Sequence, residues 1–226
     1  MIKYAKLDLK VDIKCLQNET EKIINDSVWY PHFNYSHYKG NWEVLALRSP
    51  GGMENQIIPD LMNETGFANT SLMGRFSSVQ KLIENLDCPV LSVRLLNLKT
   101  GAEIKPHRDQ CLCFEKGEVR IHIPVFTNPF VQFFIEDECI EMKEGETWYI
   151  NANGVHNVSN FGSTDRIHLV IDCKVNEWLK NIFEKSEKVM INEKQNNEEI
   201  EKIIKELRLQ NTETSNKLAD DLSKNI

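Results

Sequence analysis

The chain has 226 residues, 41% of them hydrophobic, which is enough for one domain with a substantial core. Its formal net charge of -7 argues against a nucleic-acid partner, because phosphate binding requires a basic surface. No apolar run approaches the ~20 residues that a membrane span requires, so we expect no membrane insertion.

The N-terminal residues, MIKYAKLDLKVDIK, lack the apolar stretch of a secretion signal. The six cysteines are scattered and form no CxxC pair. We therefore expect a cytoplasmic protein with reduced thiols.

The first hundred residues mix helical and strand patterns. Residues 18–29 and 77–86 each carry apolar side chains at helical spacing and predict two helices. Asn18 or Thr20 is expected near the start of the first helix. Between the helices, residues 42–46 alternate as in a strand.

The centre of the chain predicts antiparallel β structure. Gly, Asn, Pro and Asp separate five runs of β-branched and aromatic residues, at 90–99, 118–127, 131–137, 146–151 and 165–173. Many short strands without intervening helices favour a sandwich or barrel, of which a jelly roll is one kind. We predict a mainly β core with flanking α-helices.

The composition changes after residue 183, where aromatic residues vanish and Glu, Lys, Asn and Ser dominate. Four apolar residues of this tail fall on one face of a helix: Ile200, Ile203, Ile204 and Leu207. We expect residues 1–183 to form a single domain with an N-terminal α/β cover. Residues 184–226 are expected to form a polar tail, with a surface helix and a frayed end; a partner-binding helix is the alternative.

Two of the predicted strands repeat the pattern Arg-x-His, as Arg120 and His122 and as Arg166 and His168. Because side chains alternate faces along a strand, the members of each pair share one face. The turn NFGSTD predicts that His156 and Arg166 lie opposite each other as hairpin neighbours.

The stretch IKPHRDQCLCF contains His107 and Asp109. Together with His156 they have the spacing of a two-histidine, one-carboxylate triad, which leaves three positions open on octahedral iron(II). A dicarboxylate co-substrate that chelates iron at one end needs its other carboxylate neutralised within the barrel. Arg166 is suited to that role, and Arg120 is a second candidate.

Three alternatives compete with this interpretation. Arg166 could form an ordinary surface ion pair with Asp165 or Asp172. Cys111 and Cys113 could indicate zinc, although no second cysteine pair follows to complete a tetrahedral site. The alternative function is a non-enzymatic, cupin-like module that senses a metal or small molecule.

Several segments closely resemble the aspartyl/asparaginyl β-hydroxylase family of iron(II)/2-oxoglutarate oxygenases. These are LLNLKTGAEIKPHRD, VRIHIPVFTNP, GETWYINANGVHNVSNFGSTDRIHLVIDC and VNEWL, over roughly residues 90–180. WYPHFNYSHYKGNWEVLALRS is similar to the N-terminal part of bacterial members, which include relatives of proline 3-hydroxylase. The resemblance implies a double-stranded β-helix core of the jelly-roll or cupin type.

The resemblance also implies roles for individual residues. The iron ligands would be His107, Asp109 and His156, Arg166 would hold the distal carboxylate of 2-oxoglutarate, and Arg120 and His122 would assist co-substrate binding. Animal peptidyl-aspartate hydroxylases have a glycine where Asp109 stands, so this chain follows the bacterial pattern.

The implied reaction consumes O2 and 2-oxoglutarate, releases succinate and CO2, and hydroxylates an unactivated C–H bond. The implied substrate is an amino acid of the Asp, Asn or Pro type, free, carrier-bound or within a peptide. Four residues of the N-terminal half are candidates to contact it: Arg48, Trp42, Arg94 and His32.

Overall fold

The computed structural model describes residues 1–57, 66–191 and 193–224. The chain divides into two compact units, one formed by Ile2–Val189 and the other by Met190–Ile226 with Met1. Residues 184–189, which we expected in the tail, fall in the larger unit. Of the helices that the structure describes, none is long and apolar enough to cross a membrane.

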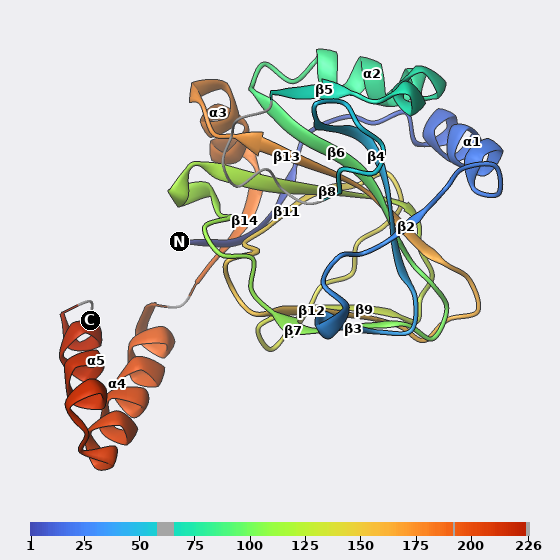
Figure 1. Cartoon of the computed structure of the whole chain (residues 1–226). Helices are drawn as coiled ribbons and strands as arrows, with labels where there is room; N and C mark the ends of the chain where they lie inside the picture. The colour runs from blue at the N-terminus through green and yellow to red at the C-terminus, as the bar shows by residue number, and fades with distance from the viewer. Residues whose placement is uncertain (58–65, 192, 225–226) are drawn as a thin grey trace. The chain divides into compact units, whose positions relative to one another are not determined.

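The larger unit contains two antiparallel sheets (Figure 1). In the described chain, the larger sheet runs in the order β14 (Glu187–Met190), β1 (Ile2–Leu7), β11 (Thr147–Ile150), β8 (Glu118–Phe126), β13 (Arg166–Lys174), β6 (Val90–Leu98), β4 (Trp42–Pro50) and β2 (Tyr30–Pro31), with β5 (Phe67–Asn69) beside β4. The smaller sheet runs in the order β10 (Glu138–Cys139), β9 (Val131–Ile135), β12 (His156–Asn160), β7 (Glu103–His107) and β3 (Tyr38–Lys39).

From β6 onward, the chain passes back and forth between the two sheets. Strands β6, β8, β11 and β13 lie in the larger sheet, whereas β7, β9 with β10, and β12 lie in the smaller one. This alternation is the strand order of a double-stranded β-helix, so the expected jelly-roll core is confirmed.

Three helices cover the outer face of the larger sheet (Figure 1): α1 (Ile13–Ile23), α2 (Ser77–Glu84) and α3 (Glu177–Lys185). Their buried side chains pack against outward-facing residues of the sheet, such as Ile121 of β8 and Leu169 of β13, in one apolar core. Short 3₁₀ helices lie at Tyr35–His37, Ser71–Arg75 and Phe114–Lys116. The residues that alternation places together on one face of β8 and of β13 thus share this core.

The first helix begins earlier than we expected. Its N-cap is Asp12, whose side chain accepts a hydrogen bond from the Cys15 N–H at 3.1 Å. Thr20 lies in the middle of the helix, buried on the same stripe as Leu16 and Ile23. The prediction that Asn18 or Thr20 starts the helix was wrong, because the buried stripe starts one turn before those residues.

A second apolar core fills the space between the two sheets. Leu96 and Val170 of the larger sheet meet Phe133 and Val158 of the smaller sheet in this core, and Trp42 also belongs to it. These residues point inward because they alternate with the outward-facing residues of the same strands.

The C-terminal unit is a helical hairpin. Helix α4 (Glu193–Gln210) and helix α5 (Glu213–Ser223) are joined at Asn211, whose φ is 48°. Thr212 and Ser215 form a capping box that starts α5. The prediction of a frayed end was therefore wrong, because this box satisfies the first backbone donors of a second helix.

Candidate functional site

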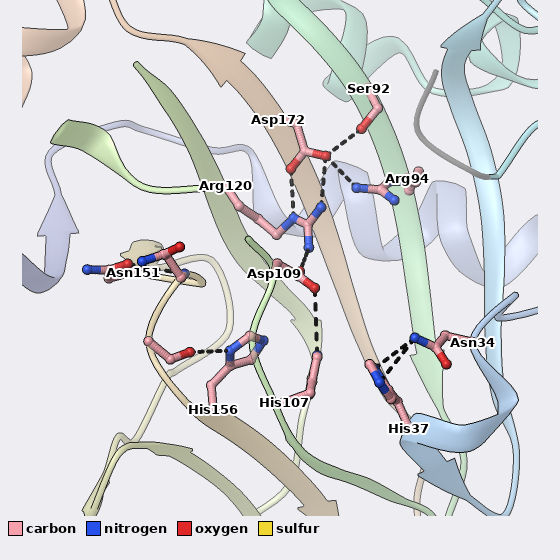
Figure 2. Close-up of polar contacts among 12 residues, drawn as sticks. Asn34, His37, Ser92, Arg94, His107, Asp109, Arg120, Asn151, His156 and Asp172 are labelled. Atoms are coloured by element: carbon pink, nitrogen blue, oxygen red, sulfur yellow. Dashed lines mark hydrogen bonds and ion pairs between the residues drawn. The ribbon is translucent and has the colours of Figure 1, made fainter. Parts of the chain in front are cut away.

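Two strands and a loop bring three ligand-type side chains together. His107 ends β7, His156 begins β12, and the two residues are partners in the strand register. Asp109 follows β7, where its backbone N–H donates to the Ala152 carbonyl at 2.8 Å. The ligand atoms of His107, Asp109 and His156 all lie within 4.8 Å of one another (Figure 2). The structure thus unites the three residues that the sequence predicts as metal ligands.

Backbone carbonyls fix which nitrogen of each imidazole is free. His107 Nδ1 lies 2.8 Å from the Lys105 carbonyl, and His156 Nδ1 lies 3.1 Å from the Gly154 carbonyl. Because a carbonyl oxygen only accepts, each Nδ1 carries the proton and each Nε2 keeps its lone pair for a ligand. Burial, with the nearby His107, lowers the pKa of His156 to about 4, so this ring is neutral at pH 7.

The donor set therefore consists of two imidazoles, each with Nε2 free of the backbone, and a carboxylate. His107 Nε2 lies 4.0 Å from Asp109 Oδ1. Burial alone would raise the pKa of Asp109, but the nearby charge of Arg120, with smaller contributions from His156 and His107, outweighs burial and lowers the pKa. Such a set suits a divalent metal of the iron(II) type and leaves coordination positions open. Among the described residues, neither Cys111 nor Cys113 belongs to this group, so the structure gives the zinc alternative no support.

Arg120 connects this group to a second carboxylate (Figure 2). Its Nη1 donates to Asp109 Oδ2, while Nε and Nη2 donate to the two oxygens of Asp172 at 2.7 and 3.1 Å. Asp172 also accepts from Arg94 Nη2, and from Ser92 Oγ at 2.8 Å. Arg120, which the sequence associates with co-substrate binding, is thus held by two carboxylates of the protein.

Arg166 lies on the same face of β13 as Asp172 but in a different environment. The residue is 1% exposed, and its Nη2 lies 2.8 Å from His168 Nδ1. Among the residues that the structure describes, no carboxylate pairs with Arg166, and its Nε has no hydrogen-bond partner. Burial lowers its pKa to about 9, so the guanidinium is still charged at pH 7. The alternative of a surface ion pair with Asp165 or Asp172 was wrong.

His122 shares this environment. Both of its ring nitrogens are buried without a hydrogen-bond partner among the described residues, and burial lowers its pKa well below the usual value. Its ring centroid lies 5.8 Å from those of Phe133 and His168. A buried cation without a counter-ion, beside an imidazole without partners, suits a carboxylate ligand that would supply the missing acceptors.

One prediction about this region was wrong. His156 and Arg166 are not hairpin neighbours, because β12 pairs with β7 and β9, whereas β13 pairs with β6 and β8. The turn NFGSTD crosses from one sheet to the other. The two residues therefore approach the interior from opposite sheets of the sandwich.

A cavity of about 420 Å³ lies beside the ligand group. Its walls include His107, Asp109 and Arg120, and also the four residues predicted to contact substrate, namely His32, Trp42, Arg48 and Arg94. Arg166 and His122 are not among its described lining residues. The cavity thus brings the expected substrate residues next to two of the expected metal ligands.

Aromatic rings form one wall of this cavity. Trp42 and His32 are stacked, with ring centroids 3.6 Å apart and an interplanar angle of 12°. Burial, with a contribution from the charge of Arg94, lowers the pKa of His32 to about 3, so the stacked imidazole is neutral. Arg48 donates to the Val90 carbonyl and the Asn69 side chain, both uncharged acceptors. Trp42 therefore both packs in the inner core and lines the cavity.

Two residues of the site, Asp172 and His37, could not be assigned to it from the sequence. Asp172 was considered only as an ion-pair partner of Arg166, although its alternation with Arg166 and His168 placed it on the inner face. His37, whose ring centroid lies 5.1 Å from that of His107, also lines the cavity and contacts Asn34. No pattern in its surroundings distinguished His37 from an ordinary loop histidine.

Comparisons with known proteins identify relatives of this chain. L-proline cis-4-hydroxylase of Rhizobium meliloti (strain 1021) is 31% identical over 135 residues, which cover 59% of this chain and 48% of that protein. The chain thus matches about half the length of this curated relative.

Solved structures with a similar fold include a Pseudomonas putida prolyl-4-hydroxylase, with 10% identity and a TM-score of 0.48, covering 78% of this chain and 94% of that one. Another is the α-ketoglutarate-dependent epimerase SnoN from nogalamycin biosynthesis, with 11% identity and a TM-score of 0.48, covering 76% and 77% of the two chains. The family model for aspartyl/asparaginyl β-hydroxylase matches residues 11–175, which is more than half of the chain. The chain belongs to the aspartyl/asparaginyl β-hydroxylase family.

Proposed function

We propose that this protein is an iron(II)- and 2-oxoglutarate-dependent dioxygenase that hydroxylates an amino acid. The observation that carries the proposal is a His-Asp-His ligand group in the same barrel as a buried arginine that has no carboxylate partner among the described residues. The ligand group suits iron(II), and the arginine suits the far carboxylate of a dicarboxylate co-substrate. Family membership and the relative named L-proline cis-4-hydroxylase support the same reaction class.

In this proposal His107, Asp109 and His156 hold the metal, and Arg166 binds the distal carboxylate of 2-oxoglutarate. Bound iron(II) would supply the oxidising chemistry, in which O2 is consumed, 2-oxoglutarate becomes succinate and CO2, and a C–H bond becomes C–OH. His122, whose ring nitrogens have no hydrogen-bond partner in the part of the chain that the structure describes, lies within reach of the same region and assists co-substrate binding.

The substrate would occupy the cavity beside the ligand group. Trp42 and His32 offer a flat apolar wall, and Nε of the buried Arg94 has no hydrogen-bond partner among the described residues. Arg94 and Arg48 would therefore receive a substrate carboxylate, while the aromatic wall orients an apolar side chain and excludes water. We propose a free or carrier-bound amino acid of the proline type, with peptidyl Asp or Asn as the alternative substrate.

The test is incubation with Fe(II), ascorbate and 2-oxoglutarate and a panel of free amino acids and of Asp-, Asn- and Pro-containing peptides. We expect succinate above the level of a His107→Ala control, and a product heavier by one oxygen atom. Succinate at the control level with every substrate would contradict the proposal and favour the sensor module.

A further inference from the structure

Asp172 is a buried carboxylate to which the proposed reaction assigns no direct task. It lies on the inner face of β13, opposite Arg120 of β8 in the strand register. Its two oxygens accept hydrogen bonds from Ser92, Arg94 and Arg120. Burial alone would raise the pKa of Asp172, but the two guanidiniums outweigh burial and lower it, so the carboxylate is charged.

Arg120 uses separate edges of its guanidinium for its two partners. Nε and Nη2 grip Asp172 in a fork, which fixes the plane of the guanidinium. The remaining Nη1 donates to Asp109 Oδ2. The other oxygen of this carboxylate, Oδ1, faces His107 Nε2. The orientation of Asp109 Oδ1 toward the histidines therefore depends on a guanidinium that Asp172 holds.

The charges lead to the same conclusion. A guanidinium paired with Asp109 alone would direct its full positive charge at that carboxylate and oppose a cation there. The carboxylate of Asp172, which is shared with Arg94, offsets part of that charge from the other side of the guanidinium. Burial alone would lower the pKa of Arg120, but Asp172 and Asp109 outweigh burial and raise it, so Arg120 stays charged.

We propose that Asp172 is a positioning residue for the metal site: through Arg120 it sets the orientation and the effective charge of the ligand Asp109. This inference rests on the proposed metal site. Asp172 itself does not touch the metal position; it acts only through the guanidinium. Groups that orient a metal ligand in this way are typically worth 10–100-fold in metal affinity.

The experiment compares metal affinity in Asp172→Asn and Asp165→Asn, with Mn(II) as an air-stable probe titrated by electron paramagnetic resonance. Asp165 immediately precedes the same strand, and it accepts hydrogen bonds from Lys99 and Asn97, away from the ligand group. The Asp165→Asn variant therefore controls for the loss of one carboxylate. We expect Asp172→Asn to bind Mn(II) about 10–100-fold more weakly, and Asp165→Asn to bind it like the wild type. The visible spectrum of the Co(II)-loaded protein should change only in the first variant.

A double variant tests whether Asp172 acts through Arg120. Lysine lacks the planar fork with which Nε and Nη2 hold Asp172 while Nη1 reaches Asp109, so Arg120→Lys breaks this fixed geometry. Asp172→Asn should then add little further loss of affinity on that background, whereas independent effects would add. Where Asp172→Asn does not fold, Asp172→Glu retains the charge, displaces the carboxylate by one methylene, and is expected to weaken Mn(II) binding.

The outcomes are distinct. A wild-type protein that binds no Mn(II) would overturn the proposed metal site itself. Wild-type affinity in both Asp172→Asn and Asp172→Glu, or full additivity with Arg120→Lys, would overturn the positioning role and leave the proposed function standing.

Discussion

The buried guanidinium of Arg166 is expected to destabilise the ligand-free protein. Burial lowers its pKa from 12.5 to about 9, a difference of about 3.5 units, or about 5 kcal/mol at about 1.4 kcal/mol per unit. Methionine in its place would remove this cost. It would also lose the hydrogen bond to His168 and the ring contact with Phe133, together worth about 1–3 kcal/mol. We therefore expect Arg166→Met to raise the free energy of unfolding by about 2–4 kcal/mol.

The same substitution should abolish the response to 2-oxoglutarate. With Mn(II) bound, 2-oxoglutarate at about 100 times its Kd should stabilise the wild type by about 2.7 kcal/mol and leave Arg166→Met unchanged. Urea unfolding measures both effects, with EDTA for the ligand-free comparison. Arg94→Met is the matched control: this guanidinium is paired with Asp172, so its removal should lower the free energy of unfolding.

A ligand-free Arg166→Met protein less stable than the wild type would refute this reasoning. It would mean that the protein itself compensates the buried charge of Arg166. Equal stabilisation of both proteins by 2-oxoglutarate would show that the co-substrate binds elsewhere.

Further predictions concern the ligands, the cavity wall and the domain boundary. His107→Ala should lose Mn(II) on equilibrium dialysis, whereas His37→Ala, on the neighbouring ring, should retain it. Trp42→Ala should lower the free energy of unfolding by about 3–5 kcal/mol and raise KM, and Trp42→Phe should recover most of both. In the folded protein the pKa of His32 is lowered to about 3, whereas in the unfolded chain it stays at about 6.5. Between about pH 3 and pH 6.5 the unfolded chain therefore binds more protons than the folded protein. The free energy of unfolding should therefore fall as the pH drops through that window, and it should fall less in His32→Phe. Urea unfolding midpoints measured across this pH range would show the difference. A chain ending at Met190 should keep the metal affinity of the full chain.

The faces of the central strands could be predicted from the sequence because they depend only on local alternation. Arg120, His122 and Arg166 point inward while their neighbours pack under helices, as the period of two required. The ligand group could likewise be predicted, because an i, i+2 pair in one extended segment, a downstream histidine and an arginine ten residues further on form a recognisable spacing.

The pairing of strands could not be predicted in the same way. His156 and Arg166 are ten positions apart across a turn, yet they lie in different sheets, because sheet membership is decided by long-range partners. The roles of Asp172 and Arg120 depend on the register between β8 and β13, which places them side by side. A register shift of one residue would leave every local pattern intact and separate this pair.

The larger sheet separates two apolar cores, one beneath the helices and one inside the barrel beside the cavity. Much of the buried apolar surface lies in the outer core, away from the cavity. Because of this partition, substitutions around the cavity change which molecule fits, while the outer core continues to stabilise the fold. Related chains could in this way diverge in substrate preference without first acquiring compensating mutations in the scaffold.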